Sequence, residues 1–260
     1  MTFEMPKTKI TPPGEGTAVR GFLDEVSWVD DAALALKSLT AAEYQPTVTN
    51  SAAALRSYVL DGTKTATDSV DFRDAVVMTP YLRRHFSAGE ATYAEAKART
   101  MAEFEAGLED YVVRTLIANA DVTDISPGGT CTLVEAVGMI ERALLATNGS
   151  RSGLLLLPPL VSARFTNYAG DDNRLPSGNR MIFSPGATPT AELTTLDSLP
   201  ADATVYGCFA PFGLKTEPEA TSSVIADDFD RTTNDIYVTV ESTVVIGFNS
   251  TAQMYACTTS

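Results

Sequence analysis

The chain has 260 residues, of which 44% are hydrophobic, and its 33 acidic and 19 basic residues give a formal net charge of −14. This composition suffices for a sizeable core but argues against sequence-specific nucleic-acid binding, because phosphate contacts require a positive surface. The longest apolar run, Gly153 to Val161, contains two prolines and falls short of the about 20 residues that span a bilayer. The N-terminus lacks the hydrophobic segment of a secretory signal, so we expect a soluble protein that acts in the cytoplasm.

Three cysteines, Cys131, Cys208 and Cys257, are widely spaced and odd in number. This pattern fits neither a disulfide framework nor a CxxC zinc motif. We therefore expect reduced thiols that are mostly buried and pack as small hydrophobic residues.

The N-terminal third of the chain contains few regular signals. Residues 1–20 are rich in proline and glycine and lack apolar periodicity, which predicts an extended arm. The apolar stretch Asp31 to Leu39 predicts a short helix. The turn-like pair Asp61-Gly62 lies between the runs 57–60 and 75–78, which indicates a long two-stranded excursion.

The clearest predicted element is a long helix. Ser87 to Glu90 forms an S-x-x-E capping box, and the next 30 residues contain no proline. At ~1.5 Å per residue, a helix from Ala88 to Asn119 would be ~45 Å long. Its expected buried stripe comprises Ala94, Met101, Phe104, Leu108, Tyr111, Val112 and Leu116.

A second helix follows the Pro-Gly-Gly break at 127–129. The capping box Thr132 to Glu135 opens it, and it is expected to end near Asn148-Gly149. Its predicted buried face consists of Leu133, Val137, Ile140 and Leu144.

The remaining sequence predicts a small α/β layer followed by β-structure. Expected in order are a buried strand at 153–157, a short amphipathic segment with Val161 and Phe165, a polar loop at 170–179 and a strand at 180–184. Residues 185–200 are loop-like, and 205–214 form another candidate strand. The strongest β signal is 235–248, with Ile236, Val238 and Val240 on one face, and 254–257 are expected to add a partner strand.

Candidate chemical groups are few. His85 is the only histidine, and its neighbour Arg84 would oppose the imidazolium that a general base must form. The pairs Asp171-Asp172 and Asp227-Asp228 are formally possible magnesium ligands, but their polar surroundings favour solvated loops.

Two short motifs resemble catalytic or nucleotide-binding sequences but lack a residue that those sequences require. Gly62-Thr63-Lys64-Thr65 lacks the upstream glycine of a phosphate-binding loop. Gly149 to Gly153 has Arg151 where a nucleophile elbow has serine, and it precedes a strand instead of following one. We therefore predict no catalytic, cofactor-binding or metal-binding residue and no cofactor.

The C-terminal peptide FDRTTNDIYV at 229–238, followed by VESTVVI at 240–246, resembles the closing segment of major capsid proteins from tailed, actinobacterial-type bacteriophages. In that family a DRxTND-like turn leads into an ERxVxV-like strand, and this chain has Ser242 where the family has arginine. The resemblance implies an α+β, Hong Kong 97-like fold. Its parts would be an N-terminal arm and linker (1–47), an E-loop region (48–86), a P-domain with the spine helix (87–128), an A-domain (129–220) and P-domain return strands (221–260).

The same resemblance implies a structural role and no enzymatic activity. Hexamers and pentamers of the chain would form an icosahedral head shell around double-stranded DNA, without sequence-specific DNA contacts and without membrane contact. A portal protein and a separate scaffolding protein are the expected partners, and the shell would assemble in the host cytoplasm and persist in the virion. The alternatives are an encapsulin-like compartment shell, a mostly β phage tail or decoration protein, and an unrecognised cytoplasmic α/β enzyme.

Overall fold

A computed structural model describes residues 21–28, 43–44, 73–87, 91–148, 153–165, 173–187, 203–209, 211–222, 236–248, 250 and 252–259. The expected arm at 1–20, the helix at Asp31 to Leu39 and the turn at Asp61-Gly62 lie outside these residues.

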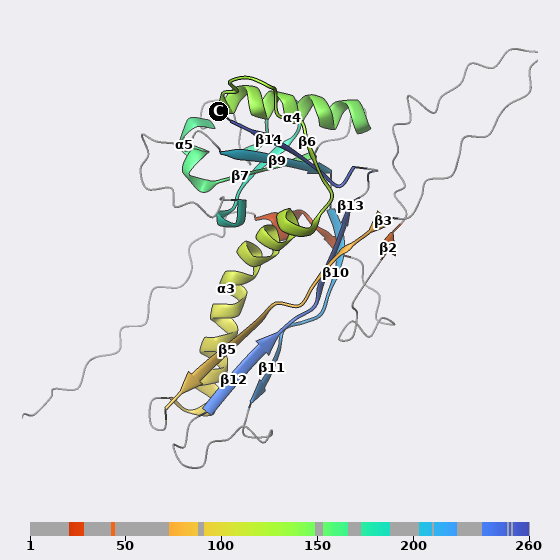
Figure 1. Ribbon diagram of the computed structural model, residues 1–260. Coiled ribbons are helices and arrows are strands. Elements are labelled where there is room, and N and C mark those ends of the chain that lie inside the picture. Colours follow the sequence, from red (N-terminus) through yellow and green to blue (C-terminus); the bar gives the residue numbers. More distant parts are fainter. Residues whose placement is uncertain are drawn as a thin grey trace, which may run out of the picture.

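A five-stranded sheet forms one end of the molecule, with the helix α4 (Leu133–Asn148) lying along it (Figure 1). The strand order is β6-β14-β9-β7-β8, in which β9 is antiparallel to both neighbours and β7 and β8 are parallel. The strands are β6 (Val122–Asp124), β14 (Met254–Thr258), β9 (Thr204–Phe209), β7 (Gly153–Leu157) and β8 (Arg180–Phe183).

Both faces of this sheet are buried. Leu155 and Leu157 of β7 pack into a cluster with Ile140 of α4, whereas Leu154 and Leu156 pack into a second cluster on the opposite face. Side chains alternate between the two faces of a strand, so a strand covered on both sides needs a continuous apolar run. This requirement explains the sequence GLLLL, all five residues of which are buried.

The predictions for this end of the molecule are largely confirmed. α4 begins at the expected capping box, in which Glu135 N donates to Thr132 Oγ1 at 3.3 Å and Thr132 N donates to Glu135 Oε2 at 2.8 Å. The four residues predicted to share its inner face are buried, as are Val161 and Phe165 in the short helices η2 (Pro159–Val161) and α5 (Ser162–Phe165). The predicted burial of all three cysteines is also confirmed.

The long helix α3 (Tyr93–Asn119) starts later than predicted. Its N-cap is Thr92, whose hydroxyl accepts from Glu95 N at 3.3 Å, so the predicted start at Ser87 is wrong. The preceding strand β5 (Tyr81–Phe86) stays paired with another strand up to Phe86. The box that forms is Thr92 to Glu95, in which Thr92 N also donates to Glu95 Oε2 at 2.9 Å.

The buried row of α3 has strict four-residue spacing. Phe104, Val112 and Leu116 are buried and Met101 and Leu108 are partly buried, as predicted, but Ala94 and Tyr111 are exposed. Ala96 and Thr100, which the prediction missed, are fully buried. Since each four-residue step turns about 40° around a helix, this row winds through roughly 200° from one end to the other. The row consists of Ala96, Thr100, Phe104, Leu108, Val112 and Leu116.

A three-stranded ribbon extends away from the five-stranded sheet, with the first half of α3 along it (Figure 1). It has the order β11-β12-β5, with β11 at Glu219–Ser222 and β12 at Ile236–Glu241, and all of its pairings are antiparallel. Val238 and Val240 of β12 are buried against Phe86, Ala96 and Phe104. The first half of α3 therefore packs on the ribbon, and the second half packs under the five-stranded sheet.

A four-stranded sheet of order β1-β10-β13-β4 joins these two parts. Two segments that were each predicted as one strand form two strands in the structure. The predicted strand 205–214 divides into β9 and β10 (Pro211–Lys215), and 235–248 divides into β12 and β13 (Val244–Phe248). The other strands are β1 (Ser27–Trp28) and β4 (Val76–Met78), and the described short elements also include α1 (Phe22–Glu25), η4 (Pro185–Ala187) and the pair β2 (Glu43–Tyr44) and β3 (Arg73–Asp74).

Candidate assembly surfaces

The residues considered for catalysis do not form a site in the described structure. His85 is exposed on β5, where its ring lies 5.0 Å from that of Tyr237. Gly153 is the first residue of β7. The two aspartate pairs and Gly62 to Thr65 lie outside the described residues. Within the part of the chain that the structure describes, no group of three or more His, Cys, Asp or Glu side chains could hold a metal ion, and no helix is long and apolar enough to cross a membrane.

The outer face of the ribbon carries polar and aromatic side chains in cross-strand rows. Directly opposed residues of an antiparallel pair point to the same side. Tyr237 lies opposite His85 and Thr239 opposite Arg83, and the Arg83 guanidinium lies 4.9 Å from the centre of the Tyr237 ring. Tyr81, at the other end of β5, is 72% exposed. This face therefore offers cationic and aromatic groups on a chain whose net charge is strongly negative.

The inner face of the ribbon is tied to α3 by an ion pair. Arg84 donates from Nε and Nη2 to the carboxylate of Glu103. The hydrogen bond from Arg84 lowers the pKa of Glu103, and the same contact raises the pKa of Arg84. The pair is solvent-exposed, so it contributes little to stability.

The outer face of α4 carries two exposed apolar side chains. Val134 is 58% exposed and Leu145 is 45% exposed. The two residues are 11 positions apart, which is close to three helical turns, so they lie on one line along the helix. Gly138, between them on nearly the same line, is also exposed, and a Cβ there would meet no other atom within 4 Å. This line therefore carries two exposed apolar side chains and a glycine, and also Glu141, which accepts from Asn179 Nδ2 at 3.1 Å.

The start of the described chain is held by two acidic groups. Glu25 of α1 forms a buried ion pair with Arg180 of β8. Glu109 of α3 accepts from the backbone N–H groups of Phe22 and Leu23 at the start of α1. Gly21 permits this approach, because a Cβ at this position would lie 1.7 Å from Glu109 Oε2. The segment that follows the expected N-terminal arm is thus fixed to both α3 and the five-stranded sheet.

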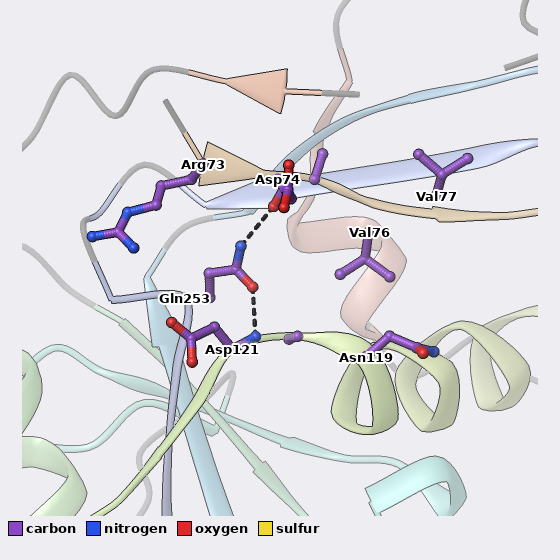
Figure 2. A pocket seen from close by; sticks show the side chains of 9 residues that line it. Arg73, Asp74, Val76, Val77, Asn119, Asp121 and Gln253 are labelled. Atoms are coloured by element: carbon purple, nitrogen blue, oxygen red, sulfur yellow. Dashed lines mark hydrogen bonds between the residues drawn. The ribbon is translucent and has the colours of Figure 1, made fainter. Parts of the chain in front are cut away.

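A cavity of about 550 Å³ lies where β3 and β4 meet the end of α3 (Figure 2). Gln253 bridges its two sides: its Nε2 donates to Asp74 O at 2.6 Å, and Asp121 N donates to its Oε1 at 2.7 Å. Gln253 is 6% exposed, and its side-chain oxygen and nitrogen each have a hydrogen-bond partner within the fold. This residue links the base of the expected E-loop region to the turn after α3. The cavity lining combines Arg73, Asp74, Ala75, Val76, Val77, Asn119, Ala120, Asp121 and Gln253.

Sequence reasoning missed these contacts for a common reason. The sequence does show the residue types, but Glu25 and Arg180 are 155 positions apart, and Gln253 and Asp74 are 179 positions apart. The capping spacing did predict the role of Glu135, whereas no local pattern indicates a partner for Glu25, Glu109 or Gln253.

The architecture is thus α+β, with a long helix that lies on a three-stranded ribbon and continues beneath a doubly covered sheet. A mostly β tail or decoration protein would not have α3, with its 27 residues. The α+β class expected from the sequence is therefore confirmed.

No protein-family model matches this chain, and no curated protein matches it. Solved structures do match this chain, and they include a capsid. The capsid of a native GTA particle matches with a TM-score of 0.60 at 10% identity, covering 98% of this chain and 95% of that one. Structures from Mycobacterium phage Ogopogo and Mycobacterium phage Che8 match with TM-scores of 0.55 and 0.53, at 12% and 13% identity. The coverage is 98% and 97% of this chain, respectively, and 96% of each of those chains. At such low identity the likeness establishes the fold.

Proposed function

We propose that this chain is the major capsid protein of a tailed bacteriophage and that copies of it form an icosahedral head shell around double-stranded DNA. The observation that carries the proposal is the extent of the structural match. Nearly the whole chain matches nearly the whole chain of three solved structures, which are the capsid of a native GTA particle and structures from two mycobacteriophages. The shared part is thus the complete fold of those chains and not a single common motif.

The proposed boundaries follow the expected ones. Residues 87–128 and 221–260 would form the P-domain, 129–220 the A-domain, 48–86 the E-loop region and 1–47 the arm and linker. α3 and β12 support the P-domain assignment, because they share an apolar cluster, which Phe86 of β5 also joins although it falls within 48–86. α4, β7, β8 and β9 support the A-domain assignment, because they share a second cluster, which Tyr255 and Cys257 of β14 also join although they fall within 221–260.

Shell formation by this chain would use several modest contact surfaces. The outer face of the ribbon and the outer face of α4 are exposed in the single chain, and each carries aromatic or apolar side chains. We propose that these faces contact neighbouring copies in hexamers and pentamers. Contacts of this kind are weak for each pair of subunits. Repeated many times over a closed surface, they together give a stable shell.

The charge of the chain fits a container for DNA. At a net charge of −14, the chain repels a polyanion at long range, which allows DNA to fill the shell without adhering to its wall. We propose that DNA contacts are not sequence-specific. We further propose that a separate scaffolding protein and a portal protein act with this chain, that assembly occurs in the host cytoplasm, and that the chain has no enzymatic activity.

The first experiment is electron microscopy with size-exclusion chromatography. The protein is expressed alone and then together with candidate scaffolding proteins encoded near it. Closed shells, or rings of five and six subunits, are the expected result. A globular monomer near the chain mass of 27.7 kDa under every condition would contradict the proposal.

A pair of substitutions on α4 tests the contact surface itself. Leu145→Asp introduces a charge on the apolar line of α4 and is expected to prevent shell or ring formation while the monomer stays folded. Ala146→Asp is the matched control, because Ala146 is also exposed but points about 100° away around the helix. If both variants assemble as well as the unchanged protein, the outer face of α4 is not a contact surface.

A further inference from the structure

Two of the three cysteines are in contact. Cys131 Sγ and Cys257 Sγ lie 3.9 Å apart, although the residues are 126 positions apart in the sequence. Cys131 is 2% exposed and Cys257 is 0% exposed, in the cluster between α4 and the five-stranded sheet. The third cysteine, Cys208, belongs to the cluster on the opposite face of the sheet. The sulfur pair is thus a feature of the tertiary structure that cysteine spacing does not reveal.

The backbone places Cys131 over Cys257 through a short exposed turn. The segment around Ile125 runs beside β14, where Ile125 N donates to Ala256 O at 2.9 Å and Thr258 N donates to Ser126 Oγ at 2.9 Å. Residues 127–130 then form an exposed turn. Cys131 follows this turn and directly precedes Thr132, the residue that caps α4.

The two sulfurs differ in how freely they can move. Cys257 is held in the ladder of β14, opposite Val205 of β9. Cys131 follows the exposed residues 127–130, and a Cβ at Gly128 or Gly129 would meet no atom within 4 Å. A disulfide requires the sulfurs to approach to about 2.05 Å. Movement of the turn can supply this approach while the sheet stays in place.

We propose that Cys131 and Cys257 are a site of intramolecular disulfide formation, with a small-molecule disulfide as the oxidant. The Cys131 thiolate attacks one sulfur of the reagent, which forms a mixed disulfide and releases the first reagent thiolate. The sulfur of Cys257, on losing its proton, then attacks Cys131 Sγ and displaces the second reagent thiolate. Two protein thiols and one reagent disulfide give one protein disulfide and two reagent thiols.

The order of the two steps follows from the surroundings of each sulfur. Burial is the main cause that raises the pKa of Cys257 to about 11, so this thiol stays protonated at neutral pH. Cys131 lies beside the exposed turn, so the reagent reaches it first when residues 127–130 move. Cys257 is the resolving thiol, and its position next to Cys131 makes the second step intramolecular.

The disulfide would join the start of α4 to the last described strand. A cross-link that closes so long a loop restricts the unfolded chain and raises stability. The chemistry requires only the folded chain. Its biological use rests on the proposed function, because a shell released from a cell passes from a reducing cytoplasm to oxidising surroundings, in which a disulfide persists.

Peptide mapping of the folded, unassembled chain tests the proposal. Trypsin would place the three cysteines on separate peptides, at 115–142, 181–215 and 232–260. The chain is incubated with 2-hydroxyethyl disulfide at mildly alkaline pH, blocked with iodoacetamide, digested and analysed by mass spectrometry. The expected product links 115–142 to 232–260, with a loss of about 2 Da. The Tm is expected to rise by at least about 5 °C and to return on reduction.

Two variants separate this reaction from general thiol oxidation. Cys208→Ala removes a buried cysteine of the other cluster and is expected to leave the cross-link unchanged. Cys257→Ala is expected to stop at the mixed disulfide on Cys131. The proposal is overturned if the wild-type chain accumulates that mixed disulfide without the cross-link, if Cys208 or a second chain takes part, or if neither thiol reacts while the chain stays folded. Because no outcome depends on shell formation, failure here and failure of the proposed function are distinguishable.

Discussion

Arg180 on the edge strand β8 donates to Glu25 of α1 in an ion pair whose side chains are only 6% and 19% exposed. The pair joins the first described segment of the chain to the five-stranded sheet across 155 sequence positions. In a poorly solvated position each charge depends on the other, since removal of one leaves the partner buried without its counter-charge. This contact therefore fixes α1, at the start of the described chain, to the five-stranded sheet.

Glu25→Ala is expected to lower the free energy of unfolding by about 2–4 kcal/mol, because Arg180 would lose its buried counter-charge. Urea denaturation of the unassembled chain measures the change. The matched control is Arg114→Ala, which removes the exposed pair between Arg114 and Asp110, four residues apart on α3, and should cost less than about 0.5 kcal/mol. Equal losses in the two variants would show that burial does not govern the Glu25 contact.

Thr132→Ala is expected to lower the free energy of unfolding by about 1 kcal/mol, because it removes the hydroxyl that accepts from Glu135 N. The Tm should fall by about 2–4 °C for a chain of this size. Thr132→Ser keeps the hydroxyl and serves as the control, with most of the stability retained. A Ser variant as unstable as the Ala variant would indicate that the methyl group, not the cap, supplies the stability.

Glu109→Gln is expected to stabilise the chain at neutral pH. Burial raises the pKa of Glu109, and the nearby carboxylates of Asp24 and Asp110 raise it further, while the N–H groups of Phe22 and Leu23 partly offset the shift. A pKa raised in the folded state means that stability is lost as the pH rises through that value. The Tm of the variant should thus exceed that of the wild type at pH 7, by a margin that shrinks below about pH 4.

Thermal unfolding over this pH range checks the Glu109 prediction. The variant keeps a side-chain oxygen that can accept from the two N–H groups, so the comparison isolates the charge. A Tm difference that is constant with pH, or that grows towards acidic pH, would contradict the assigned cause.

Gly207→Ala is expected to destabilise the chain by about 1–3 kcal/mol through overpacking, because its Cβ would lie 2.1 Å from Ile140 Cγ2. Gly207 is on β9 and Ile140 on α4, so the glycine sets how closely the helix approaches the sheet. The double variant Gly207→Ala with Ile140→Ala should lose less than the sum of the two single losses. Strict additivity would show that the two positions are not in contact.

An exposed glycine provides the control for the Gly207 prediction. A Cβ at Gly107 on α3 would meet no atom within 4 Å. Gly107→Ala should therefore stabilise the helix by about 0.5–1 kcal/mol. A destabilising effect at this position would mean that helix propensity is not the governing factor there.

Local signals predicted the helix α4 and most of α3, with one error at the start of α3. Both Ser87 to Glu90 and Thr92 to Glu95 have the capping spacing, and the sequence alone does not choose between them. The structure uses the second of them, and the first directly follows Phe86, which pairs with Ile236 in the ribbon. The predicted stripe of α3 missed Ala96 and Thr100 for a similar reason, since it assumed one buried face and the helix packs against two bodies in succession.

The long β segments show the same limit. β9 and β10 read as one run, as do β12 and β13, because strand propensity continues through both members of each pair. Each pair nevertheless divides between two sheets. Propensity describes how a residue fits an extended backbone, whereas the partner of a strand depends on distant segments.

The sequence by itself determined the helix α4 with its cap, the buried strand β7, the burial of the three cysteines and the order of elements that resembles a capsid protein. These features rest on local spacing and on apolar periodicity, which act over a few residues. Only the tertiary structure decided the start of α3, its winding buried row, the Glu25–Arg180 pair and the contact of Cys131 with Cys257. Each of these depends on which distant segments fold against one another, and the free energy of that packing outweighs the small local preferences that a sequence displays.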